Sequence, residues 1–357
     1  MQIKINGQTI SLAAPEPFLS ILRREKIYFP LYCGGRGTCG KCRIRITEGS
    51  LPITTEDRQF FSEDELKAGY RLGCRAVVTA SCAITFEKIQ REDAFYVPPV
   101  QHAEPSVREL FHRSHVVEAY GVKPDKDSRL PDKESLSIAV DIGSTTLVMA
   151  LVYTDSGKIV TEYRGLNHQR SYGTDVMARI KAAVEDGQEQ AMQALIRQDL
   201  AEGIVSLLKS SDAPIEQIVI AGNTTMLHLL RGYDCRGLSA WPFQPVNLDF
   251  EELSTAELLG ESLLVENCLL KETKVTLIAG ISAFVGADIT AGLWGCGIAG
   301  NEKPRLFLDL GTNAEMAVGN KEGMLVSSAA AGPAFEGGQL SCGTGSIPGA
   351  VRDVRIQ

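Results

Sequence analysis

Four cysteines near the amino end of the chain have neighbours that favour a thiolate-bound group. Three of them share one short loop and the fourth follows later: Cys33, Cys39, Cys42 and Cys74. The same loop contains four glycines, Gly34, Gly35, Gly37 and Gly40. Because glycine has no Cβ atom, it readily adopts positive φ and lets backbone N–H groups approach a buried anion. The pattern predicts a negatively charged metal group in this loop.

Two metal groups are compatible with this spacing. Three clustered cysteines and a distant one are typical of 2Fe-2S ferredoxins, although the plant-type pattern has four residues between the first two cysteines and here there are five. The alternative is a structural zinc ion, because Cys39-Gly-Lys-Cys42 is also half of a zinc ribbon. A ribbon needs a second close pair, whereas seven residues separate Cys74 from Cys82. We therefore expect the iron-sulfur cluster.

Two polar turns later in the chain have the residue types that hold phosphate. Each lies between apolar stretches: 141–146 reads Asp-Ile-Gly-Ser-Thr-Thr, and 309–313 reads Asp-Leu-Gly-Thr-Asn. Glycine admits phosphate oxygens to backbone N–H groups, hydroxyls donate hydrogen bonds, and aspartate binds hydrated Mg²⁺. Two such turns facing one another would clamp a phosphate chain from both sides. The candidate nucleotide-binding residues are Asp141, Gly143, Ser144, Thr145, Thr146, Asp309, Gly311, Thr312 and Asn313.

A third polar turn begins a predicted helix at Asn223. Free N–H groups at a helix start favour an anion, so Asn223 is also a candidate for nucleotide binding. Capping by Asn223 or Thr224 explains these residues equally well, and capping alone would account for Asp175 before another predicted helix. The stretch 295–300, Gly-Cys-Gly-Ile-Ala-Gly, satisfies the dinucleotide fingerprint, but it follows a helix rather than a strand and is rejected.

The elements around the cysteine loop are expected to form a small sheet with one crossing helix. Asn6-Gly7 between alternating apolar residues predicts a hairpin at the start of the chain. The other predicted elements are a helix over about 17–24, a strand over 42–46, a helix capped by Ser62 and Glu65, and a last strand over 75–86. That last strand would bring Cys74 back to the loop.

The composition divides the chain into four segments. We expect a metal-binding domain over 1–91, a proline-rich charged linker over 92–136, the first lobe of a phosphate-binding domain over 137–302, and the start of a second lobe over 303–357. The linker contains His102, His112 and His115. No arrangement of cysteines or carboxylates accompanies these histidines, which favours solvated side chains over a metal site.

Charge and hydropathy exclude several classes of partner. The net charge of −8 and the lack of a basic run make nucleic acid and anionic membranes poor partners. No apolar stretch reaches the ~20 residues that span a bilayer. The five cysteines outside the loop set are scattered, which argues against a disulfide framework and fits a reducing cytoplasm.

The amino-terminal residues resemble a ferredoxin domain of the β-grasp type, with the five-residue gap of adrenodoxin-like members. The resemblance implies that Cys33, Cys39, Cys42 and Cys74 bind a 2Fe-2S cluster and that Cys82 is a spare, buried thiol. The paired aspartate turns resemble the superfamily of actin, sugar and acetate kinases and heat-shock chaperone ATPases, which implies ATP and Mg²⁺. The expected fold is therefore an α+β β-grasp domain followed by an α/β ribonuclease-H-like lobe, with the second lobe incomplete.

The combination resembles the reductive activators of corrinoid-dependent enzymes. The supporting motifs are the cysteine set and the stretches 141–146, 221–225, 309–315 and 332–338. The resemblance implies an ATP-dependent iron-sulfur reductase that passes one electron to the Co(II) of a corrinoid protein and regenerates Co(I). It also implies a methyltransferase-system corrinoid protein as partner, an upstream electron donor and a homodimer of the full-length form. The sequence ends at Gln357, before the adenosine-binding turn expected in the second lobe.

Two other functional classes remain open. A 2Fe-2S electron carrier or adaptor without ATPase activity would be reduced and would bind its partner regardless of ATP. A sugar or acyl kinase with a redox sensor would phosphorylate a small molecule, although no sugar-binding signature supports it.

Overall fold

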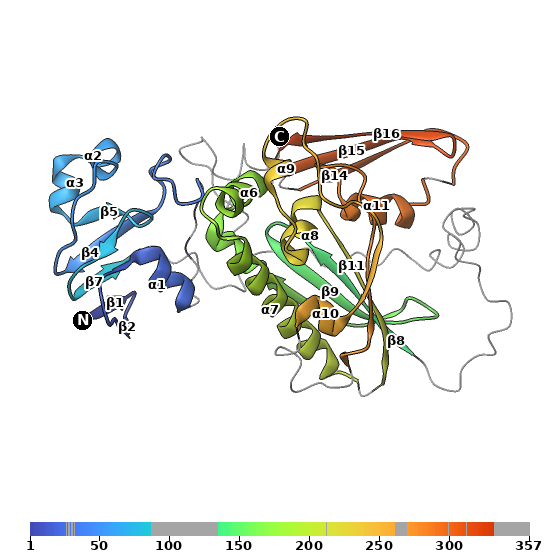
Figure 1. Ribbon diagram of the computed structural model, residues 1–357, viewed down its shortest axis with the longest axis horizontal. Helices are drawn as coiled ribbons and strands as arrows, with labels where there is room; N and C mark the ends of the chain where they lie inside the picture. Colours follow the sequence, from blue (N-terminus) through green and yellow to red (C-terminus); the bar gives the residue numbers. More distant parts are fainter. Residues whose placement is uncertain are drawn as a thin grey trace, which may run out of the picture.

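The computed structural model describes residues 1–86, 135–260 and 270–331, apart from 26, 28, 30, 32, 212, 299 and 312. These residues form a small amino-terminal domain, blue in Figure 1, and a larger domain beside it. The linker expected over 92–136 and its three histidines lie outside the described residues, except for positions 135 and 136. Leu136 already belongs to the first strand of the larger domain.

The amino-terminal domain is a mixed five-stranded sheet with one crossing helix. Its elements are β1 (Gln2–Ile5), β2 (Gln8–Ser11), β3 (Glu16–Pro17), α1 (Phe18–Arg24), β4 (Arg43–Glu48), α2 (Asp57–Phe60), α3 (Glu63–Lys67), β5 (Tyr70–Leu72), β6 (Val77–Val78) and β7 (Cys82–Thr85). The main sheet has the order β2-β1-β7-β4-β5, in which only β1 and β7 are parallel. This arrangement is the expected β-grasp fold.

Local sequence signals explain most of these elements. Asn6 and Gly7 adopt positive φ, 46° and 95°, in the predicted hairpin. The capping box of Ser62 and Glu65 begins α3 as expected. The single strand predicted over 75–86 is wrong, because the chain forms β6 and β7 with a turn between them. Alternation of apolar residues could not reveal that turn, since it lies between two stretches that are both strand-like.

The larger domain is built on a six-stranded sheet. Its elements are β8 (Leu136–Ile142), β9 (Thr146–Tyr153), β10 (Ile159–Leu166), η2 (His168–Tyr172), α6 (Val176–Val184), α7 (Glu189–Leu208), β11 (Ile215–Gly222), α8 (Thr224–Arg231), α9 (Arg236–Ser239), β12 (Glu251–Ser254), α10 (Thr255–Leu259), β13 (Lys274–Leu277) and α11 (Ala287–Gly295). The strand order is β10-β9-β8-β11-β13-β12, with β8, β11 and β13 parallel. The expected ribonuclease-H-like lobe is present.

The core of this lobe fixes which strand ends meet. Met149 of β9 and Met192 and Ile196 of α7 are fully buried in one apolar cluster, so α7 covers one face of the sheet. Parallel β8 and β11 are paired with Asp141 opposite Ala221. The carboxyl ends of both strands therefore lie at the same edge, and that edge carries the polar turns.

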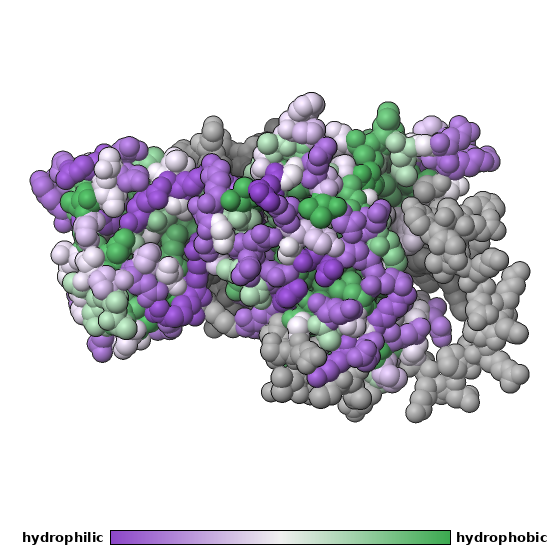
Figure 2. Space-filling view, in the orientation of Figure 1, coloured by the Kyte–Doolittle hydropathy of each residue, from purple (hydrophilic) through white to green (hydrophobic). Residues whose placement is uncertain are grey.

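A second, three-stranded antiparallel sheet follows the lobe. It consists of β14 (Arg305–Leu310), β15 (Asn313–Asn320) and β16 (Gly323–Ala330), and it contains the hairpin predicted at 309–313. Phe307 packs so closely on α11 that a Cβ at Gly292 would lie 2.6 Å from its ring. Leu306, Leu310 and Leu325 are exposed, and Figure 2 shows hydrophobic residues gathered near this sheet. Among the described residues, no helix has both the length and the apolar character to cross a membrane.

Candidate iron-sulfur centre and nucleotide site

The glycines of the cysteine loop adopt the backbone conformation that the sequence required. Gly34, Gly35, Gly37 and Gly40 have φ values of 65°, 85°, 75° and 69°. A Cβ at Gly40 would lie 2.5 Å from Cδ1 of Phe60, and one at Gly37 would lie 2.6 Å from Nε of Arg75. The left-handed backbone favours glycine at both positions, and at Gly40 the close Phe60 ring disfavours any larger residue as well.

The four predicted cysteines come together as two pairs. Sγ of Cys42 lies 3.2 Å from Sγ of Cys74, and the thiol of Cys33 is hydrogen-bonded to that of Cys39. The hydrogen bond from Cys39, together with backbone N–H groups of Thr38 and Arg36, lowers the pKa of Cys33 to about 4. The bond to Cys74 likewise lowers the pKa of Cys42, while it raises the pKa of Cys74.

This donor set fits a binuclear cluster better than a single ion. The four thiols are arranged as two pairs, Cys33 with Cys39 and Cys42 with Cys74. A 2Fe-2S cluster with four cysteine ligands distributes them over two irons. We infer that one iron would bind Cys33 and Cys39 and the other Cys42 and Cys74. Backbone N–H groups aimed at the sulfurs stabilise the thiolate form that such ligands require.

The β-sheet positions the distant cysteine. In the pairing of β4 with β5, Arg43 lies opposite Leu72, and N–H of Gly73 donates to the carbonyl of Cys42 at 2.6 Å. Asp57 is buried and accepts a hydrogen bond from N–H of Leu72 at 2.7 Å. Strand pairing therefore brings Cys74 next to Cys42. The expected spare thiol, Cys82, is buried in β7, and burial raises its pKa.

The first phosphate turn joins β8 to β9. N–H of Gly143 donates to the carbonyl of Thr146 at 3.0 Å, which closes the turn. The predicted residues Ser144, Thr145 and Thr146 are half-buried at this edge of the sheet. The second turn joins β14 to β15, where N–H of Gly311 donates to the carbonyl of Asn313 at 2.8 Å. The predicted Thr312 lies outside the described residues.

The two turns bring carboxylates together. Asp141 has a solvent-accessible surface at the edge of the sheet, yet the protein around it displaces much of the water near its carboxylate. This desolvation, together with the carboxylates of Asp288 and Asp309, raises the pKa of Asp141 to about 6. Burial and Asp309 also raise the pKa of Asp288 to about 6. Burial raises the pKa of Glu315, with a contribution from Asp288 and Asp309. Carboxylates that repel one another in this way favour a bound cation, which would stabilise their ionised forms.

Sequence reasoning missed Asp288 and Glu315 as members of this acidic group. Asp288 lies in the first turn of α11, and Glu315 follows the predicted turn in β15. A signal for Asp288 was present, because Asp141 lies at the carboxyl end of β8 and Asp288 lies in the helix that comes after β13, a parallel strand of the same sheet. Nothing in the sequence marked Glu315, because its position depends on how β15 packs near α11.

Asn223 acts as a helix cap. Its side chain accepts a hydrogen bond from N–H of Met226 at 3.0 Å, at the start of α8. Asp175 likewise caps α6 by accepting from N–H of Ala178 at 2.8 Å. Capping therefore explains both side chains. A Cβ at Gly286 would lie 2.5 Å from Cα of Asn223, so the starts of α8 and α11 meet beside the acidic group.

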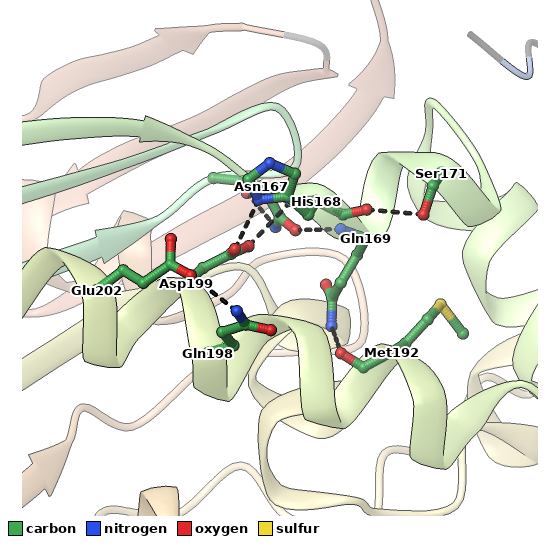
Figure 3. A network of polar contacts seen from close by, with 9 residues as sticks. Asn167, His168, Gln169, Ser171, Met192, Gln198, Asp199 and Glu202 are labelled. Carbon is green, nitrogen blue, oxygen red and sulfur yellow. Dashed lines mark hydrogen bonds and ion pairs between the residues drawn. The ribbon is translucent and has the colours of Figure 1, made fainter. Parts of the chain in front are cut away.

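A buried polar network supports the first turn from behind. Nδ2 of Asn167 donates to the carbonyl of Gly143 at 2.9 Å, and N–H of Asn167 donates to that of Thr145 at 3.0 Å. The next residue, His168, contacts Asp199 of α7 through Nδ1 at 2.6 Å and through its N–H at 2.9 Å. Figure 3 shows these side chains between η2 and α7. The network connects the turn to the longest helix of the lobe.

Comparisons with known proteins agree with this architecture. Residues 3–79 match the 2Fe-2S iron-sulfur cluster binding domain, residues 136–301 the RACo middle region, and residues 303–357 the C-terminal domain of RACo, the ASKHA domain. The corrinoid activation enzyme RamQ of Eubacterium limosum is 29% identical over 362 residues, which cover 91% of this chain and 60% of that protein. The expected 2Fe-2S and ASKHA domains are thereby confirmed.

Two further similarities bear on the fold. The Co(II) methylated amine-specific corrinoid protein reductase of Methanosarcina barkeri is 27% identical over 229 residues, which cover 61% of this chain and 40% of that protein. The solved structure of a reductive activator for a corrinoid, iron-sulfur protein aligns with a TM-score of 0.52 and 23% identity, covering 96% of this chain and 65% of that one. The chain thus spans about two thirds or less of the length of these relatives.

Proposed function

Because this chain belongs to the RACo family, with its middle region and ASKHA domain beside a 2Fe-2S domain, we propose that it reductively activates a corrinoid protein. One electron leaves the 2Fe-2S cluster and reduces Co(II) of the corrinoid to Co(I), with ATP driving the transfer. The observation that carries this proposal is the presence, on one chain, of two thiol pairs in a ferredoxin domain and four carboxylates at an actin-like nucleotide edge.

The chemistry explains why the two halves occur together. Each ~59 mV of unfavourable potential costs a one-electron transfer a factor of ten in its equilibrium constant. Reduction of Co(II) from a donor at ferredoxin potential is unfavourable in this sense. A nucleotide that binds one conformation more tightly than another can shift the population of the transfer-competent state. Electron transfer and nucleotide binding therefore belong on the same molecule.

Each group of residues has a proposed role. Cys33, Cys39, Cys42 and Cys74 hold the cluster, which supplies the electron. Ser144 and Thr145 offer N–H and hydroxyl groups to phosphate, Gly143 and Gly311 leave room for phosphate oxygens at the two closed turns, and Asn313 offers its side-chain amide from the opposite hairpin. Asp141, Asp288 and Asp309 orient hydrated Mg²⁺. The two hairpins then hold the phosphate chain between β8 and β14.

The partners follow from this role. We propose a corrinoid protein of a methyltransferase system as the electron acceptor and a separate reduced protein as the upstream donor. The seven cysteines among the described residues are all free thiols, as expected for work in a reducing cytoplasm. We further propose that the full-length form is a homodimer.

The test is reconstitution under anaerobic conditions. The cluster-loaded full chain is mixed with a Co(II) corrinoid protein and a chemical reductant, with ATP or without it, and Co(I) is followed by its visible absorbance. The proposal requires Co(I) that accumulates only when the chain, Mg²⁺ and ATP are all present. Partner binding and electron transfer at the same rate without ATP would identify a plain electron carrier instead.

A further inference from the structure

The 2Fe-2S domain rests on one surface of the larger domain, formed by η2 and α6 (residues 168–184). A guanidinium NH2 of Arg23, at the end of α1, donates to the carbonyl of Ser171 at 3.3 Å. The same guanidinium lies 4.0 Å from the centroid of the Tyr172 ring. A hydrogen bond and a cation–π contact from one side chain thus join the two domains.

The cysteine loop itself meets this surface. A Cβ at Gly34, next to Cys33, would lie 3.4 Å from Cβ of Ala178 and 3.5 Å from the carbonyl oxygen of Tyr172. Beside this contact is a cleft of about 470 Å³, lined by Arg36 of the loop and by Met177 and Lys181 of α6. The cluster-bearing loop is therefore in direct contact with α6.

The opposite side of the same surface holds the phosphate turn. Arg179 of α6 is fully buried, donates to the carbonyl of Ser144, and donates through Nε to that of Gly173 at 2.9 Å. Asn167, just before η2, donates to the carbonyls of Gly143 and Thr145. Three consecutive carbonyls of the turn, those of Gly143, Ser144 and Thr145, thus accept hydrogen bonds from Asn167 and Arg179. Arg179 belongs to the surface on which the cluster domain rests, and Asn167 adjoins it.

The surface is fixed to the core, so it can act as one body. His168 of η2 makes two contacts with Asp199, and Nε2 of Gln169 donates to the carbonyl of Met192 at 2.9 Å. Figure 3 shows both connections to α7. The contacts of Asn167 and Arg179 would transmit a shift of the phosphate turn to η2 and α6.

We propose that the η2–α6 surface couples nucleotide binding to docking of the 2Fe-2S domain, with Arg179 and Asn167 as positioning residues and Arg23 as the docking contact. The inference rests on the proposed nucleotide site. In this proposal the contacts of Asn167 and Arg179 hold the phosphate turn in the form seen with the docked domain, and nucleotide phosphates bind that form more tightly, so nucleotide favours docking. By reciprocity, docking strengthens nucleotide binding by the same factor.

The test uses the full chain with its cluster reconstituted, and the probe is Mg²⁺ with a non-hydrolysable ATP analogue. Hydrogen exchange is measured in α1 and residues 33–37, on the domain that carries no nucleotide site. Arg23→Ala removes the docking contact. Arg24→Ala is the matched control, because Arg24 neighbours Arg23 on α1 but pairs with Glu16 and Glu25 of its own domain.

We expect the analogue to slow exchange in these segments at least threefold in the wild type and in Arg24→Ala. Arg23→Ala should lose this protection and bind the analogue at least threefold more weakly, with an unchanged cluster absorbance spectrum. The inference is overturned if the wild type binds the analogue without protection, or if Arg23→Ala behaves like Arg24→Ala. A chain that shows the coupling but yields no ATP-dependent Co(I) would reject the proposed function alone, and a chain that binds no analogue would reject both.

Discussion

The sulfur of Cys42 lies 3.2 Å from that of Cys74, although Cys42 comes just before β4 and Cys74 comes just after β5. The pairing of β4 with β5 and the bond from Gly73 to the carbonyl of Cys42 produce this proximity. The distant cysteine is therefore positioned by the sheet, while its three partners are positioned by a loop of left-handed glycines. A cluster bound there depends on the fold of the whole domain.

Loss of one ligand should remove the cluster without unfolding the second domain. In Cys74→Ser, we expect the content of iron and sulfide after anaerobic reconstitution to fall by at least fivefold, because one iron keeps a single thiolate. Cys82→Ser is the control, since Cys82 is buried in β7 and lies outside the two pairs. Equal iron in the two variants would contradict the ligand assignment.

The loop glycines should differ in how well they tolerate alanine. Gly40→Ala and Gly7→Ala both place a Cβ on a left-handed residue, which costs roughly 1–2 kcal/mol. Only at Gly40 would the new Cβ also lie 2.5 Å from the Phe60 ring, while Gly7 has open space. We therefore expect Gly40→Ala to lose its cluster absorbance at a clearly lower urea concentration than Gly7→Ala. Equal urea midpoints for loss of cluster absorbance in the two variants would show that the Phe60 ring moves aside at little cost.

The acidic residue missed from the sequence should matter for nucleotide binding. Asp288→Asn removes one of the carboxylates near Asp141 and Asp309, and we expect about a tenfold or greater loss in affinity for Mg-nucleotide. Asp155→Asn is the matched control, because Asp155 is exposed in the turn at the far end of β9. Calorimetric titration measures both. An unchanged affinity in Asp288→Asn would remove that residue from the site.

The raised pKa of Asp288 should make the stability of the folded chain depend on pH. Asp288 has a pKa of about 6 in the folded chain against 3.8 ordinarily, so between pH 4 and 6 the folded state holds more protons than the unfolded state. The free energy of unfolding then falls as pH rises through this window. Without Mg²⁺, we expect Asp288→Asn to equal the wild type in stability near pH 4 and to exceed it above pH 6. Chemical denaturation at several pH values checks this, and a constant difference would contradict it.

The network behind the phosphate turn should be structurally important. Asp199 is mostly buried, accepts a hydrogen bond from the backbone N–H of His168 and contacts Nδ1 of its ring, so Asp199→Ala removes both contacts and should cost roughly 1–3 kcal/mol of unfolding free energy. Gln190→Ala, on the same helix and exposed, should cost less than about 0.5 kcal/mol. Thermal unfolding of both variants decides, and equal melting temperatures would rule out the proposed importance of Asp199.

Much of this architecture could be predicted because local signals and tertiary structure agree. The hairpin at Asn6-Gly7, the helix after Pro17 and the capping box at Ser62 are each specified by adjacent residues. The cysteine spacing and the two aspartate turns gave the two cofactors, because those patterns occur within short stretches of sequence.

The features that the sequence did not reveal depend on contacts between segments far apart in the chain. The break between β6 and β7 follows from pairing of β6 with β3, at Glu16 and Pro17. Asp288 and Glu315 join Asp309 only once α11 packs near the second sheet. The seat of the 2Fe-2S domain on η2 and α6 could not be foreseen, since Arg23 and Tyr172 carry no motif. Asn223 caps α8, and its part in nucleotide binding stays a prediction.

The most direct test of the account is a single turnover. The cluster is reduced in stoichiometric amount, free reductant is removed, and the chain is mixed with Co(II) corrinoid protein and Mg-ATP while cluster and cobalt bands are recorded together. Cluster reoxidation and Co(I) formation should proceed in equal amounts and only with ATP. Co(I) formed without cluster reoxidation, or equally well without ATP, would contradict it.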